Sequence, residues 1–166
     1  QFADDIDDSL LNRNDDLQAV APSDYGLTTK ANSVWNSAYS TYVDIASASI
    51  LTAFSSPVTI VAAPGADYVI VPIMFYVGMD YNSVAYATNT TFNFKINGVF
   101  VSADNSTILD SGLNKWTTIL PIAYDTNTNL RAQPLVFQVQ TGNPTAGNSA
   151  LNVGCVYKLF RWGIPA

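Results

Sequence analysis

From residue 47 onward, short runs of hydrophobic residues are separated by residues typical of turns. In residues 90–96, Phe92, Phe94 and Ile96 alternate with polar residues, which is the period of a strand with one buried face. Strands are expected over about eight runs: residues 50–54, 58–62, 68–77, 90–96, 99–103, 116–123, 134–141 and 150–162. Because no strong helical pattern interrupts these runs, the chain is predicted to form an all-β, antiparallel β-sandwich that is jelly-roll-like.

The turn residues predict how neighbouring strands connect. Residues 58–62 and 68–77 flank Pro64 and Gly65, two residues that favour a tight turn, and this arrangement predicts a central β-hairpin. Asn97 followed by Gly98 is a strong signal for a two-residue hairpin turn of type I′. Pro72 lies inside the longest apolar run, where a missing N–H group predicts a bulge or an edge position.

The N-terminal part of the chain has a different composition. Residues 1–46 hold eight Asp against two basic residues, a net charge of −6, whereas residues 47–166 hold five Asp and five Lys or Arg. Two parts are therefore predicted: an acidic N-terminal extension over residues 1–46, which serves attachment and oligomer contact, and a sandwich over residues 47–166. Charged residues are only 12% of the chain, about half the ~25% usual in soluble domains, and this favours a surface that packs against other subunits.

Candidate contact residues in the extension are apolar or aromatic. Ile6, Leu10 and Leu17 have a spacing compatible with one face of a short helix or coiled-coil seam, although Asp and Asn are weak helix formers. A solvated arm and an arm that docks on a neighbouring subunit both fit this composition. The side chains that we select as attachment or oligomer contacts are Ile6, Leu10, Leu17, Trp35, Tyr39 and Tyr42.

The last three of these residues have a spacing of their own. Trp35, Tyr39 and Tyr42 recur at i, i+4 and i+7, which favours one face of a short helix. The surrounding Ser and Asn residues also suit an adaptable contact surface. Packing of these rings on the sandwich or on a sister subunit is expected before stacking on a ligand.

The residues that carry chemistry are scarce, and no catalytic, cofactor-binding or metal-binding residue is assigned. The chain has no His and no Glu, which removes the Ser-His and Cys-His pairs and most zinc sites. The Asp residues of the sandwich lie in or beside predicted turns, where Asp bonds nearby backbone groups. Asn12, Asn14 and Asp16 alternate as in a calcium loop, but Leu17 stands where that loop needs Gly. Cys155 alternates with apolar residues and is expected to be buried. Enzymatic activity is therefore not expected.

Partners are restricted by charge and hydropathy. An acidic chain without a basic stripe is a poor nucleic-acid binder, and no apolar run approaches the ~18 residues that span a membrane. Two predicted loops, residues 79–90 and 104–114, are polar, and the first carries Tyr81 and Tyr86. These two rings are the candidate exposed loop contacts, with host glycans as a possible ligand class.

Three stretches resemble a known group of proteins: SPVTIVAAPGADYVIVP at residues 56–72, YATNTTFNFKING at 86–98, and LVFQVQTGNPTAGNSALNVGCVYKL at 135–159. The resemblance is to small virion proteins of tailed bacteriophages and covers residues 47–160. Its motifs are structural hairpin motifs, so no active site is carried over.

The resemblance implies a β-sandwich module on the surface of a phage particle. It implies a capsid decoration (cement) protein, or alternatively a head or tail fibre module that recognises host surface glycans. The implied partners are the chain itself, as a homotrimer, and the major capsid protein or another virion protein. Residues 1–46 lie outside the resemblance, so the expectation that they attach the protein to the shell rests on their composition alone.

Overall fold

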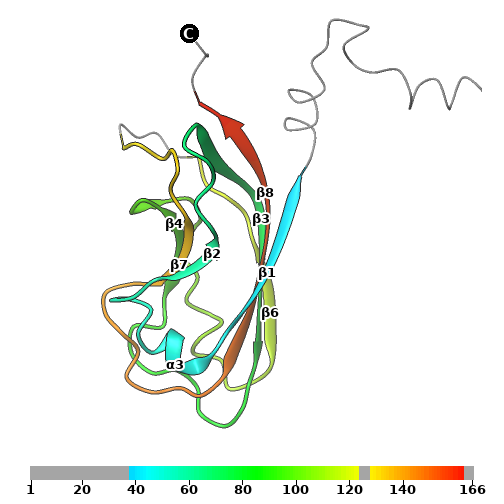
Figure 1. Cartoon of the computed structure of the whole chain (residues 1–166). Helices are drawn as coiled ribbons and strands as arrows, with labels where there is room; N and C mark the ends of the chain where they lie inside the picture. The colour runs from blue at the N-terminus through cyan, green and yellow to red at the C-terminus, as the bar shows by residue number, and fades with distance from the viewer. Residues whose placement is uncertain (1–37, 124–127, 163–166) are drawn as a thin grey trace, which may run out of the picture. The chain divides into compact units, whose positions relative to one another are not determined.

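The computed structural model describes residues 38–123 and 128–162 (Figure 1). These residues form eight strands and one short helix: β1 Tyr39–Ile45, α3 Ser47–Ile50, β2 Val58–Val61, β3 Tyr68–Asp80, β4 Phe92–Ile96, β5 Val99–Phe100, β6 Lys115–Ile119, β7 Leu135–Val139 and β8 Ala150–Arg161. The prediction of an all-β fold is confirmed.

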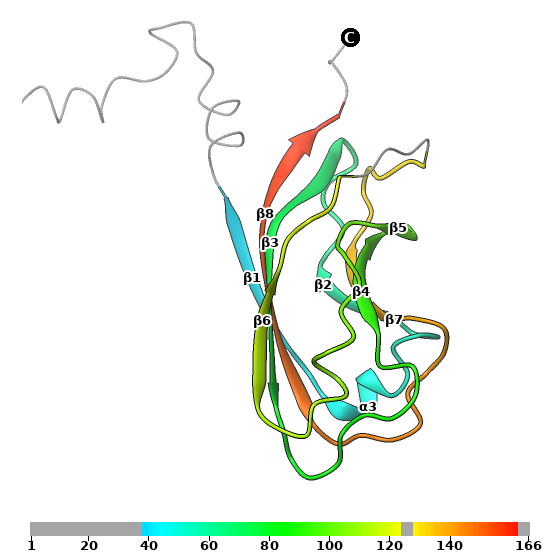
Figure 2. The ribbon, with the colours of Figure 1, turned by 180° about the vertical axis from the view of Figure 1, so that it is seen from behind.

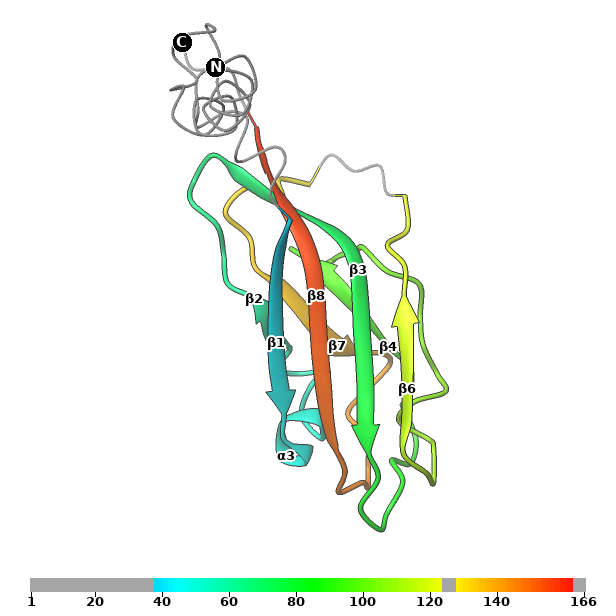
Figure 3. The same ribbon diagram turned by 90° about the vertical axis from the view of Figure 1, so that its right-hand side faces the viewer.

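The strands form two four-stranded sheets that face one another (Figures 1 and 2). The first sheet has the order β1-β8-β3-β6 and is seen face-on in Figure 3, and the second has the order β2-β7-β4-β5. The antiparallel pairs are nested, because β1 pairs with β8, β2 with β7, β3 with β6 and β4 with β5. This nested pairing of eight strands is that of a jelly roll, so the predicted antiparallel sandwich is confirmed.

The first strand was predicted in the wrong place. Residues 50–54 do not form a strand: α3 and the turns after it occupy this region, and Ile50 and Ala53 point into the core. Residues 39–45, assigned to the extension by sequence, are instead the edge strand β1 and pair with β8. Tyr39 and Tyr42, three residues apart, therefore lie on opposite faces of a strand and not on one helix face. The described residues, 38–123 and 128–162, form one compact unit, which begins before the expected boundary at residue 47.

The predicted central hairpin is also wrong. Residues 58–61 and 68–80 are both strands, but β2 and β3 lie in different sheets. Since β3 pairs with β8 on one side and β6 on the other, it has no free edge for β2, which pairs with β7. The segment containing Pro64 and Gly65 therefore crosses from one sheet to the other.

Other local predictions are confirmed. Asn97 and Gly98 have φ values of 48° and 78°, as a type I′ turn requires, and they connect β4 to β5. The register of β3 against β8 shifts between Pro72 and Met74, which is the bulge that Pro72 predicted, although β3 is a central strand and not an edge strand.

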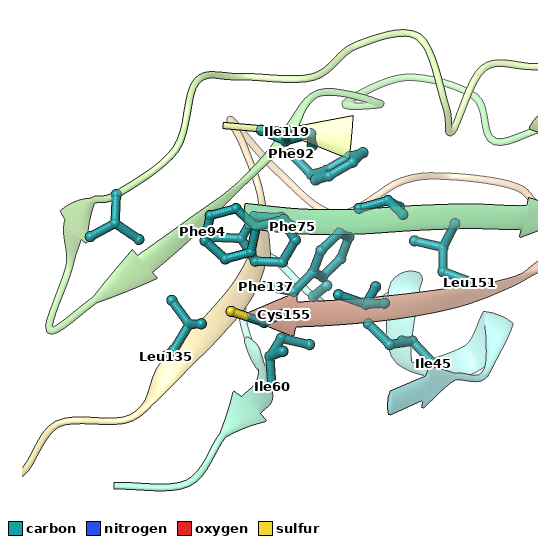
Figure 4. Close-up of a cluster of buried hydrophobic side chains, with 14 of the residues drawn as sticks. Ile45, Ile60, Phe75, Phe92, Phe94, Ile119, Leu135, Phe137, Leu151 and Cys155 are labelled. Carbon is teal, nitrogen blue, oxygen red and sulfur yellow. The ribbon is translucent and has the colours of Figure 1, made fainter. Parts of the chain in front are cut away.

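The core between the sheets is built on four phenylalanines (Figure 4). Phe75 of the first sheet stacks on Phe94 of the second, with ring centroids 4.0 Å apart and planes 1° from parallel. Phe92 and Phe137 pack beside them, with centroids 4.9 Å apart. Cys155 is buried in the same cluster, as its alternation in β8 predicted.

Candidate functional site

Four of the six predicted attachment residues lie outside the described part of the chain: Ile6, Leu10, Leu17 and Trp35. The other two are in β1. Tyr39 stacks on Tyr157 of β8, with ring centroids 5.5 Å apart. Tyr42 projects from the outer face of the first sheet with 65% of its surface exposed. The structure thus separates these two rings, and only Tyr42 lies on an open sheet face.

The loop tyrosines are engaged within the protein. Tyr86 is buried, and its hydroxyl donates a hydrogen bond to the Ser149 carbonyl, so the expectation of an exposed contact is wrong for this residue. Burial raises the pKa of the Tyr86 phenol to about 12. Tyr81 packs against the core, and its hydroxyl donates to the Ser83 carbonyl at 2.7 Å. Neither ring is presented for stacking on a ligand.

A shallow groove of about 510 Å³ lies on the outer face of the first sheet. Its floor is set by the register of four strands. In one row across the sheet, Gly154 lies between Tyr42 and Tyr76. In the next row, Gly78 lies between Asn152 and Trp116. Each row therefore has a glycine where a side chain would otherwise stand, with aromatic rings beside it.

Neither glycine is required by the backbone. A Cβ atom on Gly154 would lie 3.6 Å from the Tyr76 Cβ and the Thr41 carbonyl oxygen, and one on Gly78 would lie 3.9 Å from the Trp116 Cβ. These are ordinary contact distances. Glycine inside a strand lowers stability and often marks a place where a ligand or another backbone approaches closely. The two glycines keep the groove open, although they lower the stability of the strands that contain them.

One end of the groove is polar. The Asn152 amide donates a hydrogen bond to Asp44 Oδ1 at 2.7 Å. Partial desolvation and the Asp44 carboxylate raise the pKa of the Tyr42 phenol, and the Asn152 amide lowers it, because both side chains lie beside the hydroxyl. A carboxylate, an amide and a phenol are thus held together next to the exposed rings.

β1 and β3 begin and β8 ends at one end of the first sheet (Figure 3), and several exposed apolar side chains belong to this end and to the segment that follows β6. We call it the apolar end, and its exposed side chains are Val71, Ile73, Leu120, Ile122, Phe160 and Trp162. One exposed ion pair lies at this end, between Arg161 and Asp67 at 3.9 Å. Two of the apolar side chains, Phe160 and Trp162, pack edge to face with ring centroids 6.2 Å apart, and exposed apolar side chains that form a patch are typical of a protein contact.

The remaining polar and reactive groups have structural partners. Asn93, one of the polar residues that alternate with Phe92, Phe94 and Ile96 and that the strand pattern places on the solvent face, is buried; its amide donates to Asp104 Oδ1 at 2.7 Å, and its oxygen accepts from Gln140 Nε2 at 2.7 Å. Burial raises the pKa of the Cys155 thiol to about 12, so the thiol is protonated at neutral pH. Within residues 38–123 and 128–162, no group of three or more potential metal ligands is present. No helix in this part of the chain is long and apolar enough to cross a membrane.

Sequence reasoning missed most of the groove. It selected Tyr42 but not Tyr76 or the glycines, because a row across the sheet depends on strand register. The aromatic spacing in residues 39–45 was interpreted as helical. The edge strand that carries Tyr42 beside Gly154 and Tyr76 was therefore not expected. The available signal was alternation in residues 39–45, where Thr41, Val43 and Ile45 share one face of a strand.

No protein-family model matches the chain, and no curated protein matches it. Among solved structures, the chain is similar to a chain of the cyanophage Pam1 capsid asymmetric unit. The identity is 15%, the TM-score is 0.45, and the match covers 73% of this chain and 84% of that one. A likeness this distant carries no argument about function.

Proposed function

We propose that this chain is a non-enzymatic structural protein of a phage particle, a decoration (cement) protein that binds the shell as a homo-oligomer. The observation that carries the proposal is the apolar end. It lies at the end of the first sheet where β1 begins, at Tyr39. The sequence motifs that resemble phage virion proteins lie in the jelly roll itself and give the proposal its second support.

The occupant proposed for the apolar end is a second copy of the chain. Leu120 is 63% exposed and stands just beyond the last residue of β6, so it is available to a neighbouring subunit. An interface that is stable in solution commonly buries about 1,200–2,000 Å² in total. We expect a trimer, as the resemblance implies. The predicted contacts Ile6, Leu10 and Leu17 would add the attachment to the shell.

The carboxylates offer little support for an enzyme. Asp44 accepts a hydrogen bond from Asn152, Asp104 accepts one from Asn93, and Asp67 pairs with Arg161. With no His and no Glu in the chain, general acid–base chemistry would need Asp residues whose pKa values are shifted. These contacts fit structural roles, and the proposal is therefore of a binding and stabilising protein.

The second candidate is a head or tail fibre module that recognises host glycans. The predicted loop residues Tyr81 and Tyr86 do not favour it, because both are engaged internally. The observation in its favour is the aromatic groove on the first sheet, at a different place from the loops.

The test compares two leucines at opposite ends of β6 in the full-length chain. Leu120 follows the strand and belongs to the apolar end, whereas Leu113 precedes it and is 74% exposed. We expect Leu120→Asp to give monomers in analytical ultracentrifugation and to lose binding to shells that lack the protein. Leu113→Asp should behave as the native chain. A native chain that is monomeric, or a Leu120→Asp variant that still assembles and binds shells, would refute the proposal.

A further inference from the structure

The groove on the outer face of the first sheet has the features of a binding site for a small ligand. Its volume of about 510 Å³ lies within the 300–1,000 Å³ common for ligand sites. Tyr42, Tyr76 and Trp116 line it, and Trp116 is 75% exposed. A tryptophan ring that contributes so little to the core is available for a partner.

We propose that this groove binds a neutral oligosaccharide, whose sugar rings stack on Tyr42, Tyr76 and Trp116. The face of an aromatic ring carries a partial negative charge. The face of a pyranose ring presents C–H groups, which are weakly positive, so the two surfaces attract. Gly154 and Gly78 leave the floor low enough for a flat ring to lie between the aromatic side chains.

The polar corner supplies hydrogen bonds of the kind that sugars need. Asn152 uses one N–H to bond Asp44, and the Tyr42 hydroxyl lies beside both side chains, so the corner presents amide, carboxylate and phenol groups that can donate to or accept from a sugar hydroxyl. Neighbouring hydroxyls on a sugar ring each donate and accept. An adjacent carboxylate and amide can form hydrogen bonds with two neighbouring hydroxyls at the same time, which fixes the orientation of the sugar ring.

The charge of the groove selects neutral sugars. No Lys or Arg is among its lining residues, and Asp44 stands at its polar end beside the lining residues Tyr42 and Asn152. The Asp44 carboxylate would repel an acidic glycan, and no lining residue supplies a compensating cation. We therefore expect no affinity for sialylated glycans.

Two other occupants compete for an aromatic groove: a proline-rich segment in the polyproline II conformation and a second copy of the chain. A proline-rich segment needs apolar slots and few acceptors, and it gives no role to the pair of Asp44 and Asn152. A second copy is already placed at the apolar end by the proposed function. The oligosaccharide uses both the rings and the polar corner. The exclusion of a second copy rests on the proposed function, whereas sugar binding itself concerns a separate surface.

The experiment screens the full-length protein on an array of neutral and sialylated glycans. Titration calorimetry then follows with maltohexaose, cellohexaose and chitohexaose. We expect saturable binding to at least one neutral oligosaccharide. Trp116→Ala should weaken it by about tenfold or more, as the loss of an interface hot spot does. Gly154→Val should abolish it by filling the floor, while the added side chain suits a strand and leaves the melting temperature unchanged or higher.

The matched control is Trp162→Ala. Trp162 is 58% exposed but belongs to the apolar end, so its loss should leave sugar binding unchanged. The proposal is overturned if no neutral glycan on the array binds, or if sialylated glycans alone bind. Binding that survives both Trp116→Ala and Gly154→Val would also overturn it, as would a decaproline peptide that binds the groove in place of sugars. None of these results bears on oligomer formation, which Leu120→Asp tests separately.

Discussion

The contact between Gly147 and Tyr86 gives the sharpest test of the packing at one end of the sandwich. A Cβ atom on Gly147 would lie 2.1 Å from Tyr86 Cδ1 and 2.4 Å from Cε1, far inside contact distance. Gly147 also has a φ of 132°, which side chains rarely adopt. Because the Tyr86 ring is buried and bonded to the Ser149 carbonyl, it cannot move aside without leaving its site. Gly147→Ala should therefore expel the ring.

The cost follows from two terms. Loss of a buried aromatic ring costs about 3–5 kcal/mol, and a residue forced into positive φ adds about 1–2 kcal/mol. Their sum is a large part of the ~5–15 kcal/mol by which domains are stable. Urea unfolding of the full-length chain measures it. The control is Gly112→Ala, where a Cβ would meet nothing within 4 Å, and which should stay within about 0.5 kcal/mol of the native chain.

A double-mutant cycle separates the clash from the backbone strain. With Tyr86→Ala already present, Gly147→Ala should cost only the strain of about 1–2 kcal/mol, because no ring remains to be expelled. If the two losses are fully additive, the contact is not the cause. If Gly147→Ala is as mild as Gly112→Ala, the placement of the Tyr86 ring is wrong.

Two further changes test the core. Phe94→Ala removes the partner of Phe75 between the sheets and should lower the free energy of unfolding by about 3–5 kcal/mol in urea titration; a loss below about 1 kcal/mol would contradict the stacked arrangement. Burial raises the Cys155 pKa from 9.0 to about 12, so unfolded chains lose the thiol proton at lower pH than folded ones. Its contribution to stability should be complete below pH 9.0 and fall as the pH rises toward 12. Cys155→Ala should unfold with a weaker dependence on pH in this range, and an unchanged dependence would contradict the burial of the thiol.

The sequence was most informative where local chemistry decides the structure. Asn97 and Gly98 accept positive φ, so the turn between β4 and β5 could be read from two residues. The alternation of Phe92 and Phe94 with polar residues correctly predicted which face of β4 is buried. Pro72 predicted the bulge in β3, because proline lacks the N–H group that a regular strand would use for pairing.

Pairing between distant segments was not predictable in the same way. Residues 58–62 and 68–77 are close in sequence and were expected to pair, yet their partners lie much further along the chain, such as Phe137 opposite Val58 and Ile119 opposite Phe75. Asn93 followed the alternation of an outward residue but is covered by Asp104 and Gln140, two residues from other segments. The groove could not be predicted for the same reason. Its two rows of side chains form only when four strands pair in the observed register.

The copy number of this chain in purified particles tests the proposed function most directly. Particles from the phage to which the chain is proposed to belong would be analysed by quantitative mass spectrometry, and labelled electron microscopy would locate the chain. A decoration protein should be present in many copies, in multiples of the oligomer, spread over the shell. A few copies at the tail or at one vertex would contradict the decoration role and favour a fibre module. Absence from the particles would contradict any virion role and leave the jelly roll alone established.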